Sequence, residues 1–187
     1  MLRSRSALFA AAVRLVSERG TTAIAVTDLA EAADVSRRLV YLQFGDRESL
    51  LVEAAVDLVR RELIPQAEAG TDAHERVLAL ARHFARHRSF YRAMLSGSCA
   101  FAMTRTLNGL FSSINKDAVR DLFDGLDEDT AQDVAVFVAG GTGTVVNDWL
   151  IDGDDPLEPE ELAHRLLRLE AIFTGGHHRR AGRDGDQ

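Results

Sequence analysis

The segment VTDLAEAADVSRRLVYLQFGDRESL, residues 26–50, carries the most specific local pattern in this 187-residue sequence. Within it, Leu29 and Ala33 recur at helical spacing, and the pattern stops at Asp34, a residue type that tolerates a left-handed turn. Ser36 then stands where its hydroxyl can cap the amides that open a second helix. The segment therefore predicts two short helices joined by a tight turn.

The second of these helices is brief, and its faces differ in character. Val40 and Phe44 share an inner apolar face, whereas the arginines of its first turn project elsewhere. Gly45 is expected to end the helix, and Asp46 is placed to cap the next one. A short helix with arginines in its first turn, held across a tight turn from another helix, is the layout of a DNA-reading helix-turn-helix.

The same part of the chain resembles the N-terminal DNA-binding domain of TetR-type transcriptional regulators. The shared motifs agree in order and spacing and lie within about residues 3–59; the rest of the chain resembles the family only in layout. They are Glu18-Arg19-Gly20, Asp28-Leu29-Ala30, Val35-Ser36, Tyr41 with Phe44, and Arg47-Glu48 with Leu50. The resemblance implies a bacterial regulator that binds double-stranded DNA and is not an enzyme.

Specific DNA contacts follow from the resemblance. The helix formed by residues 37–44 would enter a major groove, where Arg37 and Arg38 would contact guanine or phosphate. Thr27 is expected to cap the preceding helix, because Ala25 stands where the family usually has a threonine. The full set of expected DNA-binding residues is Thr27, Ser36, Arg37, Arg38, Leu39, Tyr41, Gln43 and Arg47.

The charge is unevenly distributed along the chain. A net charge of −7 would by itself argue against nucleic-acid binding. Residues 1–50, however, hold seven arginines and six acidic residues, which leaves about +1 on this head and about −8 on the remainder. A slightly basic head on an acidic body fits local phosphate contact, although so small an excess also fits chance fluctuation.

The expected compartment is the cytoplasm. Cys99 is the single cysteine, so no intramolecular disulfide can form. The start MLRSRS leads directly into an amphipathic pattern, so no signal peptide is expected. No apolar run reaches the roughly 18–20 residues that cross a bilayer, and no membrane partner is expected.

Helical periodicity continues through the rest of the chain, with no alternating strand pattern. We predict an all-α fold of about nine helices, divided into a helix-turn-helix domain at 1–50, an effector-binding and dimerisation domain at 51–174, and a disordered tail at 175–187. Outside residues 26–45, helices are expected over residues 4–19, 46–63, 72–88, 89–95, 99–123, 128–151 and 160–173.

Aromatic and sulfur-containing side chains cluster in the middle helices. Such stripes usually form core, but in a TetR-like body the same helices enclose a cavity for a small-molecule effector, so some of these side chains are expected to line it. The candidates for ligand binding are Phe84, His87, Tyr91, Met94, Met103, Asn108 and Phe111.

Helices 128–151 and 160–173 are more apolar than a body of this size needs. Paired with their copies in a second chain they would form a four-helix interface, which the resemblance also implies; the alternative is that they close the core of a monomer. The glycines of the GGTG segment, residues 140–143, would allow close helix approach. The expected interface residues are Val138, Gly141, Val145, Leu162, Leu166 and Phe173.

Motifs for other chemistries are weak in this sequence. His83 and His87 are four apart on a helix, a spacing that can place two imidazoles on one metal ion, but no H-E-x-x-H pattern includes them, so neither a metal nor a cofactor is predicted. The sequence favours a dimeric repressor released by a small apolar effector. A helical enzyme acting on an apolar small molecule and an effector-independent architectural DNA-binding protein remain the alternatives.

Overall fold

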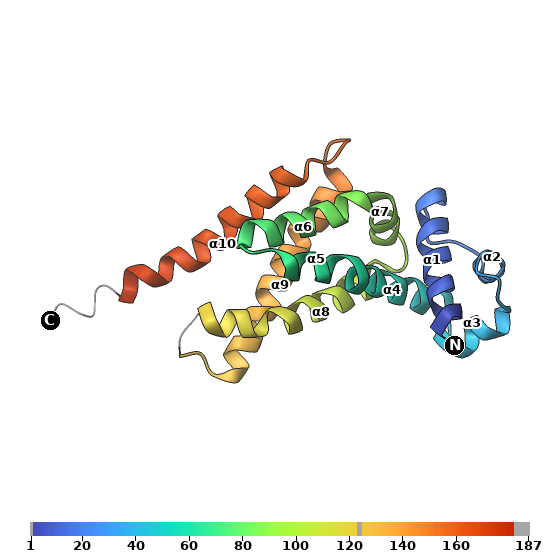
Figure 1. Ribbon diagram of the computed structural model, residues 1–187, viewed down its shortest axis with the longest axis horizontal. Coiled ribbons are helices and arrows are strands. Elements are labelled where there is room, and N and C mark those ends of the chain that lie inside the picture. Colours follow the sequence, from blue (N-terminus) through green and yellow to red (C-terminus); the bar gives the residue numbers. More distant parts are fainter. Residues whose placement is uncertain (1, 123–124, 182–187) are drawn as a thin grey trace.

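The computed structural model describes residues 2–122 and 125–181, and no strand occurs among them (Figure 1). Because α4, η1 and α5 continue without a break, these residues form nine separate helical rods, which confirms the predicted all-α fold. The elements are α1 (Leu2–Arg19), α2 (Val26–Ala32), α3 (Arg37–Phe44), α4 (Arg47–Leu58), the π-helical segment η1 (Val59–Leu63), α5 (Ile64–Ala69), α6 (Ala73–Arg86), α7 (Arg88–Ser96), α8 (Ala100–Leu122), α9 (Glu128–Asp152) and α10 (Pro159–Ala181).

Local backbone chemistry sets the boundaries of α3. Ser36 and Asp46 cap α3 and α4 with side-chain oxygens that accept backbone N–H bonds at 3.2 and 2.7 Å. Asp34 takes the left-handed φ of 52° that the turn before α3 needs, and Gly45 has φ 78° where α3 ends. Each of these four predictions from the sequence is confirmed.

Aromatic contacts hold α3 against α1. The rings of Phe9 in α1 and Phe44 in α3 lie 5.7 Å apart. The Arg5 guanidinium lies over both rings, at 5.3 and 5.1 Å from their centroids, and pairs with Glu53. These contacts fix α1, α3 and α4 relative to one another.

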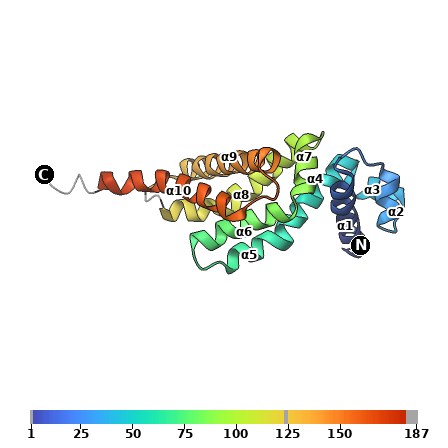
Figure 2. The same ribbon diagram turned by 90° about the horizontal axis from the view of Figure 1, so that it is seen from above.

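The molecule is elongated, with the head at one end and the C-terminal half of α10 projecting from the other (Figures 1 and 2). The continuous rod α4–η1–α5 leads from the head into the body, α8 and α9 lie side by side, and α10 packs on α6. One connected set of buried apolar side chains extends from Leu8 in α1 to Leu166 in α10. The head and the body therefore share one connected core.

The two C-terminal helices differ from the predictions in length and character. α10 continues past Phe173 to Ala181, so the predicted disordered tail is helical as far as the structure describes it; residues 182–187 lie outside the described residues. α9 is long and apolar enough to cross a membrane by length and composition alone, contrary to the prediction, although core helices of globular proteins pass the same test. The prediction counted uninterrupted apolar runs, whereas α9 reaches this hydropathy with a few polar residues included.

Candidate functional site

The outward face of α3 carries the charged and aromatic side chains that the sequence singled out. Arg37 and Arg38 are exposed, and Tyr41 is 47 % exposed. Val40 and Phe44 are buried on the opposite side and attach the helix to the head. The buried pair thus presents the first turn and outer face of α3 to a partner.

The other expected DNA-binding residues lie closer to the surface of the head. Ser36 is exposed at the cap, Leu39 is half-buried, and Gln43 and Arg47 are half-buried. Among the described residues, Gln43 Oε1 and Arg47 Nε have no hydrogen-bond partner. Both side chains lie where α3 meets α4, next to the outward face.

Thr27 does not have the capping role expected of it. Ala25 occupies the N-cap of α2, with no side-chain hydrogen bond. Thr27 lies one residue inside the helix, and its hydroxyl donates to the Asp28 carboxylate at 3.4 Å. The amides at the start of α2 therefore lack a side-chain acceptor.

A cavity of about 80 Å³ lies between α6, α7, α8 and α9. Five of the seven residues expected to bind an effector line it. Its lining residues are Leu80, Phe84, Tyr91, Leu95, Met103, Thr104, Leu107, Asn108, Phe111, Asn115, Val138, Ala139, Thr142, Gly143, Val146, Asn147 and Leu150.

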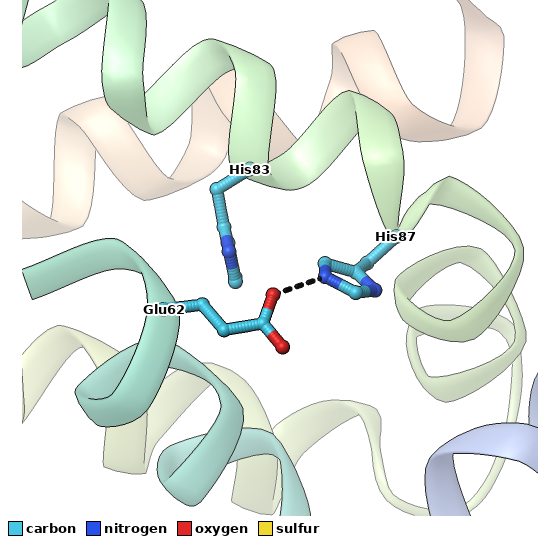
Figure 3. Close-up of side chains that lie close together, drawn as sticks. All are labelled: Glu62, His83 and His87. Carbon is cyan, nitrogen blue, oxygen red and sulfur yellow. Dashed lines mark hydrogen bonds and ion pairs between the residues drawn. The ribbon is translucent and has the colours of Figure 1, made fainter. Parts of the chain in front are cut away.

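His87 and Met94 are the two expected effector residues that do not line this cavity. Met94 is completely buried on another face of α7, where it belongs to the shared core. His87 caps the end of α6, and its Nε2 lies 2.7 Å from a carboxylate oxygen of Glu62 (Figure 3). The aromatic stripe in the sequence did not reveal that these two residues face away from this cavity.

Polar groups of the cavity come mainly from α8 and α9. Asn108 approaches the backbone of α9 so closely that a Cβ on Gly143 would lie 2.6 Å from its Oδ1. Asn115, Thr142 and Asn147 were missed from the sequence. Each of these polar residues interrupts an apolar helical stripe, which is a pattern visible in the sequence. The sequence does not show which of the polar residues come together in one cavity.

The cavity is small for an organic ligand. About 80 Å³ holds only a few water molecules, whereas pockets that bury drug-sized ligands usually measure 300–1,000 Å³. A larger ligand would have to separate the helices that enclose the cavity. Because these helices belong to the shared core, ligand entry and a change in helix positions would occur together.

Tyr91 connects the cavity to a buried histidine. Its hydroxyl lies 2.9 Å from Nε2 of His83, which is 1 % exposed. Burial lowers the pKa of His83 to about 4, and burial also raises the pKa of Tyr91. Both groups are therefore neutral near pH 7.

The expected dimer residues divide between the surface and the core. On α9, Val138 is 37 % exposed, Gly141 is exposed and Val145 is half-buried. Leu162 and Leu166 are instead buried within the single chain, on the side of α10 that packs on α6, so their expected place at an interface is wrong. The side chain of Phe173 lies outside the described residues.

Comparisons with known proteins support the same family from both halves of the chain. The model of the bacterial regulatory proteins of the tetR family matches residues 8–54, and a model of a transcriptional regulator C-terminal region matches residues 71–170. The HTH-type transcriptional regulator BetI of Rhizobium meliloti (strain 1021) is 35% identical over 81 residues. That alignment covers 42% of this chain and 40% of BetI.

Solved structures share the fold over almost the whole length. A TetR-family regulator from Rhodococcus sp. is similar with a TM-score of 0.59 and 21% identity, covering 93% of this chain and 100% of that one. FadR from Bacillus subtilis, solved in complex with stearoyl-CoA, is similar with a TM-score of 0.51 and 18% identity, covering 88% and 96%. At these identities the likeness concerns the fold alone.

Proposed function

The chain belongs to the TetR family of bacterial transcriptional regulators, and we propose that within it this protein is a dimeric repressor that a small apolar effector releases from DNA. The observation that carries the proposal is the face of α3, where exposed arginines stand on a helix fixed by Val40 and Phe44. Residues 1–50 form the DNA-binding unit, residues 51–174 bind the effector and the second chain, and the protein acts in the cytoplasm.

DNA binding follows from the position of α3. With its N-terminal turn in a major groove, Arg37 and Arg38 reach guanine edges or phosphates, and Leu39 and Gln43 lie near neighbouring bases. Thr27, Ser36, Tyr41 and Arg47 surround this helix and contact the phosphates that fix its register.

A second copy of the chain covers an apolar face of α9 and α10. Val136 and Phe137 are 51 % and 65 % exposed on α9, and Leu169 and Ile172 are 37 % and 69 % exposed on α10. Only 28% of the apolar window of α9 is buried in the single chain. Exposed large apolar side chains of this kind are typical of an interface, and a two-fold dimer buries both helices of each chain against their copies.

The effector binds in the cavity between α6 and α9. The walls formed by Phe84, Met103 and Phe111 are apolar, and Asn108 offers hydrogen bonds to a polar end of the ligand. FadR from Bacillus subtilis was solved in complex with stearoyl-CoA, which carries a long apolar acyl chain, and this likeness supports a ligand with an apolar part. The ligand acts by stabilising a helix arrangement in which the two heads no longer match their half-sites.

Thermodynamic linkage between effector binding and DNA binding provides the experiment that tests this proposal. A ligand found by thermal shift is titrated with and without duplex DNA selected by the protein, and Trp149, the single tryptophan, reports binding by fluorescence. A releasing ligand binds the DNA complex more weakly, by the same factor by which it weakens DNA binding. Emptying an almost fully occupied site requires a factor near ten-thousandfold. Equal ligand affinity in both titrations contradicts release by that compound.

A further inference from the structure

Three side chains that can ligate a metal ion meet where the rod from the head passes α6. Glu62 comes from η1, and His83 and His87 come from the end of α6. Each offers one ligand atom, and these atoms all lie within 4.8 Å of one another. Figure 3 shows the three side chains directed into the space between the two helices, with the Glu62 carboxylate between the rings.

His83 is the buried member of this cluster, and one of its ring nitrogens is unsatisfied. Nε2 is hydrogen-bonded to the Tyr91 hydroxyl at 2.9 Å, whereas Nδ1 is buried without a hydrogen-bond partner among the described residues. Buried polar atoms are nearly always paired, so this exception requires an explanation. An imidazole that binds a metal through one nitrogen usually has its other nitrogen hydrogen-bonded, as His83 has.

The backbone at Glu62 is also unusual. Residues Val59–Leu63 form a π-helical turn within an otherwise α-helical rod. Such turns are rare and commonly lie at functional sites. Val59 and Leu63 are buried in the core on either side, which fixes Glu62 in its position opposite α6.

The charges around the cluster are of both signs. The Glu62 carboxylate supplies a negative charge, and Arg61, whose Nη2 lies 3.9 Å from Glu62 Oε1, supplies an opposing positive charge. A neutral imidazole is the form that ligates metals, so a metal ion binds His83 and His87 as neutral rings.

We propose that Glu62, His83 and His87 form a binding site for a divalent transition-metal ion such as Zn²⁺, Co²⁺ or Ni²⁺. Two imidazoles and one carboxylate are a ligand set that these ions accept, with remaining coordination positions open to water. The ion replaces the direct hydrogen bond between Glu62 and His87, and any proton on His87 leaves to solvent. It joins the rod that carries the head to α6 of the body.

The test is a metal titration of the full chain. His177 and His178 can also bind metal, so the titration uses a chain carrying His177→Ala and His178→Ala. Calorimetry with Zn²⁺ and visible absorption with Co²⁺ are expected to show one ion per chain, with a dissociation constant in the micromolar range or below, and a raised Tm. Absence of saturable binding below about 100 micromolar for both ions overturns the proposal.

Ligand variants decide whether binding occurs at this cluster. Glu62→Gln and His87→Asn change side chains that are 29 % and 19 % exposed, so both are expected to fold, as checked by circular dichroism, and to weaken binding at least about tenfold. His74→Ala is the matched control, because His74 forms a separate surface group with Glu160 at 3.5 Å and with His164. If the control weakens binding as much as Glu62→Gln does, or if neither Glu62→Gln nor His87→Asn weakens it, the assignment is wrong.

Discussion

Gly97 lies against Thr22 so closely that a Cβ at residue 97 would overlap the Thr22 hydroxyl oxygen. Thr22 is buried in the turn between α1 and α2, and Gly97 directly follows α7. At the same junction the Ser98 hydroxyl donates to the Glu48 carboxylate at 2.5 Å. The head therefore rests on the end of α7, a helix that also supplies the Tyr91 wall of the cavity.

Gly97→Ala is expected to disturb this junction. The Ala93 backbone oxygen and the Thr22 methyl carbon also lie 3.1 Å from the added Cβ, so relief of the contact requires more than a small shift of the Thr22 hydroxyl. Overpacking of this kind costs about 1–3 kcal/mol in the free energy of unfolding, which urea denaturation measures. Gly109→Ala is the control, since nothing lies within 4 Å of its added Cβ, and it should be neutral or stabilising. Equal stability of the two variants would show that the contact at Gly97 has no energetic consequence.

Arg38→Ala is expected to weaken binding to the specific duplex by about 1–3 kcal/mol and to relax base preference at one position. Arg47→Ala should weaken binding to all sequences more evenly, because its proposed contact is with phosphate. Fluorescence anisotropy at fixed salt separates the two effects. Unchanged affinity and base preference in Arg38→Ala would remove this residue from the reading surface.

Phe137→Glu is expected to convert the dimer to monomers without unfolding the chain. The side chain is 65 % exposed in the single chain, so only an interface would bury the new charge. Phe101→Glu, at a phenylalanine that is 77 % exposed on α8, is the matched control and should stay dimeric. Sedimentation velocity at micromolar concentration distinguishes these outcomes, and a monomeric unmodified chain would contradict the dimer itself.

Stability is expected to fall as the pH is lowered from 6.5 to 4. The pKa of His83 is lowered to about 4 in the folded chain, so between these values the unfolded state binds a proton that the folded state does not. The full stabilisation is present above pH 6.5, and about 3 kcal/mol is lost by pH 4. Urea unfolding across this range should give a shallower slope for His83→Leu than for the unmodified chain. An identical slope would show that His83 is not buried as a neutral ring.

The caps and turns of the head could be predicted from short-range sequence rules. The caps at Ser36 and Asp46 and the turn residues Asp34 and Gly45 depend on neighbours only a few positions away, so the sequence determines them directly. The expected cap at Thr27 lies two positions after the observed N-cap, Ala25, since the choice of N-cap depends on the chain direction entering α2.

The body depends on pairings between distant segments. Leu162 and Leu166 form an apolar stripe on α10, but the sequence cannot show whether α6 or a second chain covers it. Glu62 lies 25 residues before His87, and the π-helical turn that carries it has no recognised sequence signal here. Aromatic residues were predicted to line a cavity. The lining residues on α9 could be recognised only from the packing of α8 against α9.

Selection of bound duplexes from a random library at fixed salt tests DNA reading by α3 most directly. The unmodified chain is expected to enrich a two-fold symmetric sequence with half-sites separated by about 10–10.5 base pairs or a multiple of this spacing. A chain carrying Arg37→Ala and Arg38→Ala should lose that enrichment while keeping its fold and its dimer. Enrichment of no sequence by the unmodified chain, or of the same sequence by both chains, would contradict the assignment of α3 as the DNA-reading helix.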